Sequence, residues 1–347
     1  MPKDIRHIAV IRLSAMGDVA MTVPTLLAFV EKYPSVKVTV VSRSLFEPIF
    51  FGISNVSFFA ADVKGRHKGF LGLMKLKTDL QHLGIDAVVD LHDVIRSRVI
   101  TTLMKFGGVP TVSIDKARAE KKALTRSESK VFVQLPTVAQ RNSEAFAELG
   151  FPIVINPPIF LSKRKLSPEV SQLTGAKSTK WLGIAPFAKH NSKVYPEDLM
   201  KKVIDGLAVN DYKIFLFGAG TKELSILNGY AGRHENIVVP GGKISFQEEL
   251  QLISNLDTML SMDSANAHLA AMFGIPVITL WGATHPFAGF APFAQPFDNA
   301  LVSDRSKYPK LPTSIYGNKK VAGYEDVMRS IEPEKVIEKV LETIEKG

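Results

Sequence analysis

Two aspartates stand where a predicted strand passes into a helix, and each could act on a bound substrate. The first lies in "IRLSAMGDVAMTVP" (residues 11–24), where Gly17 permits a tight turn and Asp18 follows it. A carboxylate at the end of a strand can accept a proton from a substrate hydroxyl. Asp is also a favoured helix N-cap, so spacing alone leaves capping and base catalysis equally open for Asp18, whereas its position at a strand end, where a cleft-facing base would stand, favours the catalytic role.

The second aspartate lies in "MDSANAHLAAMFGIPVITLWGATHP" (residues 262–286). Four residues open a helix there: Asp263, Ser264, Ala265 and Asn266. Small residues at a helix start let backbone N–H groups approach a phosphate. Asp263 could accept from a sugar hydroxyl and His268 could donate to a diphosphate. The alternatives are capping for Asp263 and Ser264 and a structural histidine packed on a strand end for His268.

Two further strand-end loops carry residues suited to a phosphorylated ligand. Gly218 and Gly220 form a glycine-rich turn in "FLFGAGTKELSIL" (residues 215–227), which lacks the full dinucleotide fingerprint. Lys193 lies in "APFAKHNSKVYP" (residues 185–196) and could neutralise a departing diphosphate. Solvated loop lysines are the alternative.

The stretch "DLHDVIRSR" (residues 90–98) combines acidic, histidine and arginine side chains at a strand end. Asp and His in this order can bind a metal, but one short cluster favours a structural or substrate-contacting role. Arg96, one turn into the next helix, could contact an anionic substrate.

Charge is distributed unevenly along the chain. Residues 1–165 hold 24 Lys and Arg against 14 Asp and Glu, whereas residues 166–347 hold 19 against 20. Part of the excess lies in "KGRHKGFLGLMKLK" (residues 64–77), which contains Lys64 and Arg66. A basic half suggests an anionic partner, which could be a nucleic acid, a membrane surface or a phosphorylated substrate; solvated loops with no partner are the alternative.

Alternating short apolar runs and amphipathic stretches must position these residues. We expect strands at 7–13, 36–41, 56–60, 86–91, 110–114, 181–187, 212–218, 236–240, 257–262 and 276–282. We expect helices at about 19–32, 70–83, 93–106, 138–149, 196–208, 221–231, 245–254, 264–273 and 333–346. This alternation predicts an α/β protein with two doubly wound parallel sheets. The proline-rich segment 151–169 is the expected linker, and residues 283–323 are expected to be loops.

The composition excludes several classes of protein. With 46% hydrophobic and 22% charged residues the chain is typical of a soluble globular protein, and it has no cysteine. We expect a cytoplasmic protein, because no signal-peptide core and no apolar run of about 20 residues is present. P-loop, Gly-x-Ser-x-Gly, His-Glu-x-x-His, kinase and nucleic-acid-binding motifs are also absent.

At these stretches the sequence resembles the ADP-heptose:lipopolysaccharide heptosyltransferases, glycosyltransferase family 9. The similar motifs are "RLSAMGDVAMTVP", "VVDLHDVIRSR", "LGIAPFAKHNSKVYP", "LFGAGTKE", "DSANAHLAAMFGIP" and "WGATHP", in the family's order. They span nearly the whole chain.

The resemblance implies a GT-B fold, made of two Rossmann-like domains facing each other across a cleft. An acceptor-binding domain would cover residues 1–165, joined by the helix 333–346, and a nucleotide-sugar-binding domain would cover 166–330. The reaction would be inverting, metal-independent and without a cofactor, with ADP-heptose as the expected donor substrate. The acceptor would be the phosphorylated lipopolysaccharide core, which implies peripheral contact with the cytosolic face of the inner membrane.

The resemblance also implies residue roles. Asp18 matches the family's base, Lys193 matches a contact to the donor diphosphate, and Asp263, Ser264, Ala265 and His268 match the donor-binding loop. Asn266, Gly218 and Gly220 would border the donor, and Gly17, Lys64, Arg66 and Arg96 would border the acceptor. Two departures concern the donor: Ala265 replaces a usual glycine, and Gly220 stands where some members have a glutamate, for which Glu223 is a possible substitute.

Two other functions remain open from the sequence. A nucleotide-sugar epimerase or hydrolase of the same fold would turn over donor without an acceptor. A non-catalytic nucleotide-sugar-binding protein would keep its ligand affinity when Asp18 is replaced.

Overall fold

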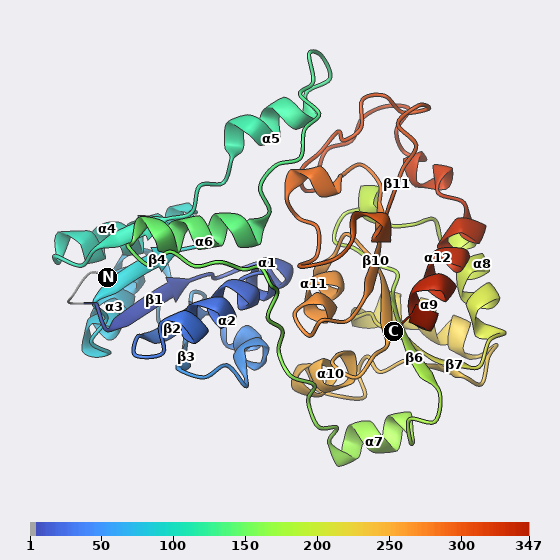
Figure 1. Cartoon of the computed structure of the whole chain (residues 1–347), viewed down its shortest axis with the longest axis horizontal. Coiled ribbons are helices and arrows are strands. Elements are labelled where there is room, and N and C mark those ends of the chain that lie inside the picture. Colours follow the sequence, from blue (N-terminus) through green and yellow to red (C-terminus); the bar gives the residue numbers. More distant parts are fainter. Residues whose placement is uncertain (1–4, 347) are drawn as a thin grey trace. The chain divides into compact units, whose positions relative to one another are not determined.

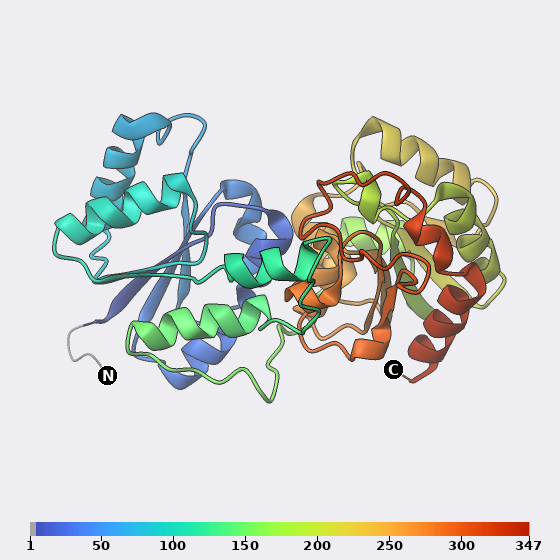
Figure 2. The ribbon, with the colours of Figure 1, turned by 90° about the horizontal axis from the view of Figure 1, so that it is seen from above.

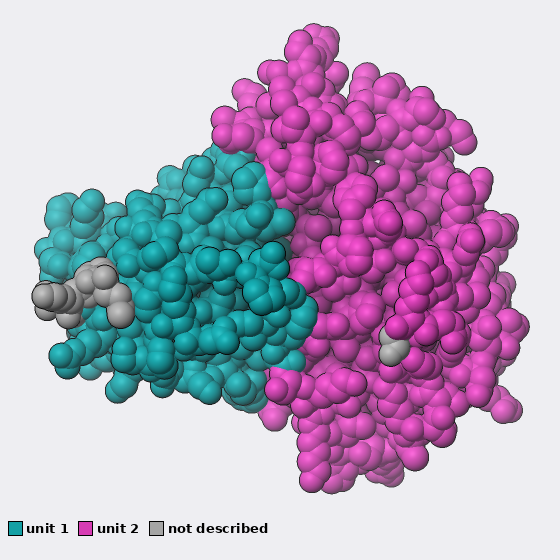
Figure 3. All heavy atoms as spheres, in the orientation of Figure 1, with its two compact units in different colours: residues 1–118, 136–161 teal, residues 119–135, 162–347 magenta. Residues whose placement is uncertain are grey.

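The computed structural model describes residues 5–346, and they form two compact units (Figures 1 and 3). Unit 1 contains residues 1–118 and 136–161, and unit 2 contains residues 119–135 and 162–347. The chain therefore changes unit within the expected linker, between residues 161 and 162, and also at both ends of the segment 119–135. Each unit is an α/β layer structure of its own.

Unit 1 is built on a five-stranded parallel sheet in the order β3-β2-β1-β4-β5. Its strands are β1 (His7–Ile11), β2 (Lys37–Ser42), β3 (Val56–Ala60), β4 (Ala87–Asp90) and β5 (Thr111–Ser113). In register, Ile11 lies opposite Val41 on one side and Asp90 on the other. Consequently the loops that follow β1 and β4 leave the same edge of the sheet side by side.

Helices cover both faces of this sheet (Figure 2). They are α1 (Met16–Ala20), α2 (Val23–Lys32), α3 (Gly69–His82), α4 (Ile95–Phe106) and α6 (Val138–Glu148), with a short 3-10 helix η1 (Ser44–Phe50). On one face α3 and α4 bury Leu76, Leu80 and Met104 against Ile11 and Val88. On the other face α2 packs on α6, so apolar side chains of each strand are buried on both sides, as expected for a parallel sheet.

Unit 2 repeats the plan with a six-stranded parallel sheet in the order β11-β10-β9-β6-β7-β8. The strands are β6 (Lys180–Ala185), β7 (Tyr212–Leu216), β8 (Ile237–Val238), β9 (Thr258–Met262), β10 (Val277–Trp281) and β11 (Ala300–Val302). Counted within each unit, the strand order is 3-2-1-4-5 in unit 1 and 3-2-1-4-5-6 in unit 2, which confirms the predicted doubly wound class. In such sheets ligands bind beyond the carboxyl ends of the strands, at the point where the order reverses. That point lies between β1 and β4 in unit 1 and between β6 and β9 in unit 2.

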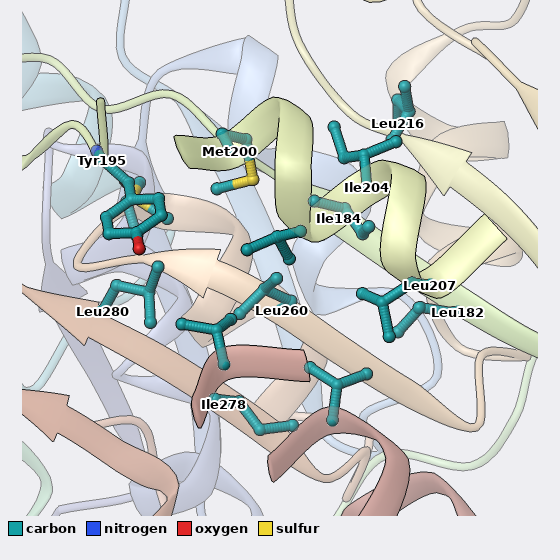
Figure 4. Close-up of a cluster of buried hydrophobic side chains, with 14 of the residues drawn as sticks. Leu182, Ile184, Tyr195, Met200, Ile204, Leu207, Leu216, Leu260, Ile278 and Leu280 are labelled. Atoms are coloured by element: carbon teal, nitrogen blue, oxygen red, sulfur yellow. The ribbon is translucent and has the colours of Figure 1, made fainter. Parts of the chain in front are cut away.

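The helices of unit 2 enclose a continuous apolar core. They are α7 (Pro168–Thr174), α8 (Glu197–Ala208), α9 (Gly220–Ala231), α10 (Phe246–Ile253), α11 (Ala265–Ala271) and α12 (Pro333–Lys346), with short 3-10 helices η2 (Asn191–Lys193), η3 (Pro286–Ala288), η4 (Phe297–Asn299) and η5 (Val327–Ser330). Figure 4 shows Leu182, Leu260 and Ile278 of the sheet meeting Ile204 and Leu207 of α8. Burial of such a side chain contributes about 1.5 to 3 kcal/mol.

The final helix α12 packs within unit 2, which corrects the expectation that helix 333–346 joins the N-terminal domain. Val336, Val340 and Ile344 are fully buried in the unit 2 core, and the Tyr212 hydroxyl donates to Glu345 at 2.5 Å. The apolar stripe of α12 therefore packs on α8 and the sheet of unit 2. The helix was predicted correctly, but its amphipathic pattern carries no information about which partner it covers.

Three elements, besides the short 3-10 helices, have no counterpart among the predicted ones, and the first is α7, which begins within the expected linker 151–169. The helix α5 (Arg118–Thr125) begins the segment 119–135 that belongs to unit 2, and the short strand β11 lies in the region expected to be loops. The segment 119–135 packs through Leu124 and Leu135 against Ala288, and the backbone N–H of Leu135 donates to Phe287 O at 2.9 Å. The packing of this segment depends on tertiary contacts. Its mostly polar sequence does not indicate which part of the protein it will contact.

Candidate functional site

In unit 1 a buried arginine holds Asp18 at the point where the strand order reverses. Arg12 directly follows β1, and its guanidinium lies 2.8 Å from Asp18 Oδ2. The same guanidinium donates to the carbonyl of Leu91, which follows β4. Arg12 thus joins the two strand ends, while the Asp18 side chain remains 27% exposed. A carboxylate that is fixed in direction yet reachable from solvent is suited to accept a proton from a bound hydroxyl.

Asp18 also contributes to the helix start, so the two interpretations of this residue are not exclusive. Helix α1 begins at Met16, and Asp18 Oδ2 accepts the backbone N–H of Ala15 at 3.2 Å. Asp18 is therefore inside the first turn rather than the N-cap. Gly17 is a helical residue of α1, which corrects its expected place in the turn: Ser14 and Ala15 make the connection from β1.

His92 completes this part of unit 1 from the β4 side. Its Nε2 lies 3.3 Å from the hydroxyl of Ser14. Burial, together with the positive charges of Arg12 and Lys116, lowers the pKa of His92 to about 3, so the imidazole is neutral at physiological pH. A neutral imidazole can orient a substrate hydroxyl by donating or accepting one hydrogen bond.

The acidic residues of the 90–98 stretch bind backbone and side-chain groups of the protein. Asp90 accepts the backbone N–H groups of His92 and Asp93 at 2.8 and 3.0 Å, and burial raises its pKa. Asp93 is bound by Arg98 and Arg118, each at 2.6 Å. Within residues 5–346 no group of three or more His, Asp or Glu side chains is arranged to hold a metal ion. These aspartates therefore shape the loop after β4.

Three predicted acceptor residues lie at the carboxyl edge of the unit 1 sheet but in different settings. Lys64 and Arg96 are exposed, in the loop after β3 and at the start of α4. Arg66 is exposed as well, but its guanidinium is bound to Asp79 by two nitrogens, with a shortest distance of 2.8 Å. Its charge is therefore largely paired with Asp79 of α3.

In unit 2 the corresponding position holds a lysine–aspartate pair. Lys193, in the loop after β6, lies 2.9 Å from Asp263 Oδ2, and Asp263 directly follows β9. The Thr284 hydroxyl donates to the same oxygen at 2.8 Å. Asp263 is buried and Lys193 nearly so, which places a fixed positive charge beside the sheet edge. Such a charge can stabilise a departing phosphate.

Neighbouring backbone holds Lys193 in place. The Ser192 hydroxyl donates to Gly317 O at 2.7 Å, and the backbone N–H of Ala283 donates to Ser192 O at 3.0 Å. Gly317 has φ +77°, and a Cβ there would come within 2.6 Å of the Lys193 side chain. The lysine stem therefore passes over a glycine, and a larger residue would displace it.

The predicted donor-binding loop forms the start of helix α11. Ser264 is the residue before the helix, Ala265 and Asn266 are its first two residues, and all three are partly exposed. The Ser264 hydroxyl lies 3.1 Å from that of Ser261 and caps no backbone N–H. His268 is buried on the same helix. The structure thus brings Asp263, Ser264 and Lys193 to one strand end.

The glycine-rich turn after β7 owes its composition to packing. A Cβ at Gly218 would meet Leu227 at 2.8 Å and Glu223 Oε2 at 3.2 Å, and Gly220 adopts φ +76°. Glu223 accepts the backbone N–H of Ala219 at 2.9 Å. Glu223, which the resemblance suggests as a nucleoside contact, therefore stabilises this turn.

Sequence reasoning did not identify Arg12 and Thr284 as site residues. The available signal was that each is a polar residue next to apolar or small residues at the end of a predicted strand, in "VIRLS" and "WGATHP". Their importance comes from the ion pair with Asp18 and the hydrogen bond to Asp263, and neither partner is adjacent in sequence.

Comparison with known proteins identifies the family. Residues 73–319 match the model of glycosyltransferase family 9 (heptosyltransferase). Lipopolysaccharide heptosyltransferase 3 of Escherichia coli K12 is 26% identical over 342 residues, which cover 91% of this chain and 94% of that protein. In the described residues, no helix is both long and apolar enough to cross a membrane.

Solved structures share the fold. A family 9 glycosyltransferase from Veillonella parvula superposes with a TM-score of 0.77 at 19% identity, covering 100% of this chain and 99% of that one. The E. coli heptosyltransferase WaaC, solved with ADP, superposes with a TM-score of 0.69 at 18% identity, covering 97% and 99%. The predicted GT-B fold is confirmed. With two doubly wound units and a family match over most of its length, the chain belongs to glycosyltransferase family 9, the heptosyltransferase family.

Proposed function

We propose that this glycosyltransferase transfers a heptose from ADP-heptose to the lipopolysaccharide core by an inverting, metal-independent displacement. The observation that carries the proposal is the solvent-reachable carboxylate of Asp18, fixed by Arg12 at the reversal point of the unit 1 sheet. The acceptor oxygen forms a bond to the anomeric carbon, its proton passes to Asp18, and the bond from that carbon to the diphosphate oxygen breaks. A single displacement of this kind inverts the anomeric configuration.

Unit 2 supplies what the leaving ADP needs. Lys193 is oriented by Asp263 and offers positive charge to the diphosphate, in the role that a divalent cation has in other enzymes. Ser264, Ala265 and Asn266 border this position, and Gly218 and Gly220 form the adjoining turn. His268 is proposed to act on the donor from α11. The WaaC structure contains ADP, which supports an adenine nucleotide as the donor's nucleoside part.

The acceptor is proposed to meet unit 1, bordered by Gly17, Lys64, Arg66 and Arg96. Because a lipopolysaccharide core is anchored in lipid, the protein would work at the cytosolic face of the inner membrane through peripheral contact. No cofactor beyond the donor substrate is required by this mechanism.

The decisive experiment measures ADP release from ADP-heptose in the presence of a heptose-free lipopolysaccharide core acceptor and EDTA. Asp18→Asn should lower kcat by at least about 10²-fold while donor binding persists, because the base is lost and the charge is needed only for proton transfer. Lys193→Gln should lower the rate by a similar factor and also weaken ADP binding. NMR of the product should show the inverted anomeric configuration.

Other results would reject specific parts of the proposal. ADP release at the same rate without acceptor would identify a hydrolase or epimerase. Full activity in Asp18→Asn would remove the proposed base, and loss of activity on adding EDTA would show that a metal is needed.

A further inference from the structure

The first turn of helix α3 presents apolar side chains to solvent, away from the core. Phe70 and Leu71 are 62% and 73% exposed, and Met74, one turn further on, is 45% exposed. The opposite face of α3 is fully used, because Leu73, Leu76 and Leu80 are buried against the sheet. The exposed residues therefore cannot contribute to the unit 1 core.

Cations surround this apolar patch. Lys68 precedes the helix, Lys75 follows Met74, and both are exposed. The stretch 64–77 contains five Lys and Arg and no Asp or Glu, and unit 1 as a whole holds 17 Lys and Arg against 12 Asp and Glu. The positive excess of five in this stretch of 14 residues equals the positive excess of the whole unit. We call Lys68, Phe70, Leu71, Met74 and Lys75 the α3 surface.

The exposure does not come from a loose loop. Asp62 accepts the backbone N–H groups of Gly65 and Arg66 at 2.8 and 2.9 Å. His67 is buried; its Nδ1 accepts the Asp62 N–H at 3.0 Å and its Nε2 lies 3.0 Å from Asp79. A Cβ on Gly72 would meet the backbone of His67 at 2.3 Å, so the helix start is packed closely on this loop. The α3 surface is therefore held in a fixed orientation.

Its place in the fold matches the proposed acceptor position. Helix α3 follows β3, so its first turn lies at the carboxyl edge of the unit 1 sheet, as do the loops that carry Arg12 and His92. At the same edge a hollow of about 240 Å³ is lined by Arg43, Leu45 and Lys64, among others. Exposed apolar residues mixed with lysines are typical of surfaces that bind the headgroup region of anionic membranes.

We propose that the α3 surface is a membrane-docking surface, in which Phe70 and Leu71 enter the interfacial region of an anionic bilayer while Lys68 and Lys75 contact its headgroups. This names the membrane-contacting part of the protein, and it rests on the proposed function only in that a lipid-anchored acceptor calls for membrane contact. Vesicle binding does not require turnover, so the two proposals fail separately.

The test measures sedimentation of the full-length protein with vesicles of phosphatidylcholine containing about one third phosphatidylglycerol. Wild type should bind these vesicles, bind pure phosphatidylcholine far more weakly, and dissociate as salt is raised. Phe70→Ser with Leu71→Ser should weaken binding at least on the order of tenfold. Lys68→Gln with Lys75→Gln should weaken it by about tenfold and reduce its salt dependence.

A matched control comes from the far end of the neighbouring helix. Lys105 and Phe106 close α4 at the opposite edge of the sheet, and Phe106 is 87% exposed. Lys105→Gln with Phe106→Ser removes the same chemistry there and should leave binding unchanged. On a water-soluble core acceptor, the α3 surface variants should keep wild-type kcat.

Several results would overturn the inference. They are absence of wild-type binding to the anionic vesicles, an equal loss in the control variant, and unaltered binding in both α3 surface variants. Light scattering provides one more: if wild type is a dimer that Phe70→Ser with Leu71→Ser dissociates, the surface binds a second copy of the chain. Vesicle binding without any heptosyl transfer would keep this inference and reject the proposed function instead.

Discussion

At the scale of single residues, the main feature is that polar groups at the two reversal points are paired. Arg12 orients Asp18, and Asp263 orients Lys193. Arg12 follows a strand and Asp18 lies in the next helix, whereas Lys193 and Asp263 lie in loops that follow two different strands. In both pairs one member is the group proposed to act, and the other fixes its direction. A charged side chain held in this way needs little rearrangement when charge develops during reaction.

His92 gives a prediction about pH. Its pKa is lowered to about 3, mainly by burial, with Arg12, Lys116 and Arg96 disfavouring the imidazolium and Asp18 favouring it. In the unfolded chain a histidine has a pKa near 6.5, so between about pH 6.5 and 3 only the unfolded state binds this proton. Stability is therefore lost as pH falls through that window, by about 2 kcal/mol at about pH 5. Above the window the group has no such effect.

Urea unfolding monitored by far-UV circular dichroism checks this. His92→Gln should lose about 2 kcal/mol less stability than wild type between about pH 7.5 and pH 5. His285 offers a comparison in unit 2, since burial and Arg305 lower its pKa to about 4. His285→Gln should reduce acid destabilisation reported by the emission of Trp181 and Trp281, which both lie in unit 2. Identical losses in wild type and His92→Gln would show that His92 does not carry the acid sensitivity.

At the scale of elements, the ends of parallel strands explain why the site residues meet. Lys193 follows β6 and Asp263 follows β9, and these strands are neighbours in the unit 2 sheet although about 70 residues separate the two side chains. The loop after β6 is held by hydrogen bonds between Ser192 and two distant segments, at Gly317 and Ala283, so residues outside the loop also set the position of Lys193.

Gly317 tests this dependence. Gly317→Ala would place a methyl group against the Lys193 stem, so we expect Lys193 to move away from Asp263 and ADP affinity to fall by about tenfold. Gly323→Ala is the matched control, because Gly323 has nearly the same φ of +76° but open space around the new Cβ. Calorimetric titration with ADP measures both. Equal affinity in the two variants would mean that backbone strain, not contact with Lys193, governs the change.

At the scale of the whole molecule, the two units divide the charge differently from the two halves of the sequence. Unit 1 holds 17 Lys and Arg against 12 Asp and Glu, and unit 2 holds 26 against 22. The basic N-terminal half contributes the segment 119–135 and residues 162–165 to unit 2. The excess is therefore shared, and within unit 1 it gathers in the stretch 64–77.

The segment 119–135 belongs to unit 2 although unit 1 residues precede and follow it in the sequence, and its attachment to unit 2 can be tested. Leu135 is buried, Phe132 packs between Arg305 and His285, and the Lys130 amine donates to Pro312 O at 2.8 Å. Leu135→Ala should destabilise this attachment by about 2 to 5 kcal/mol and speed tryptic cleavage after Arg126 and Lys130 in proportion. Val133→Ala, at an exposed neighbour, should cleave like wild type. Unchanged cleavage in Leu135→Ala would show that Leu135 does not hold the segment.

The sequence by itself determined most of the regular elements, since apolar periodicity and turn residues are local properties. It predicted β3 and α12 to the residue and the capping box of Ser245 and Glu248, and the motifs indicated the family. It also placed Asp18, Lys193 and Asp263 at strand ends, because a strand followed by a helix start has a recognisable composition.

Tertiary structure decided which of these elements and side chains meet. The pairing of Arg12 with Asp18, the support of Asp263 by Thr284, and the choice of unit 2 by α12 and by residues 119–135 all depend on contacts between residues far apart in sequence. An apolar stripe specifies that a helix must be covered but not by what, and a charged side chain specifies a need for a partner but not its identity. Those choices follow from the strand order and from the packing of both units.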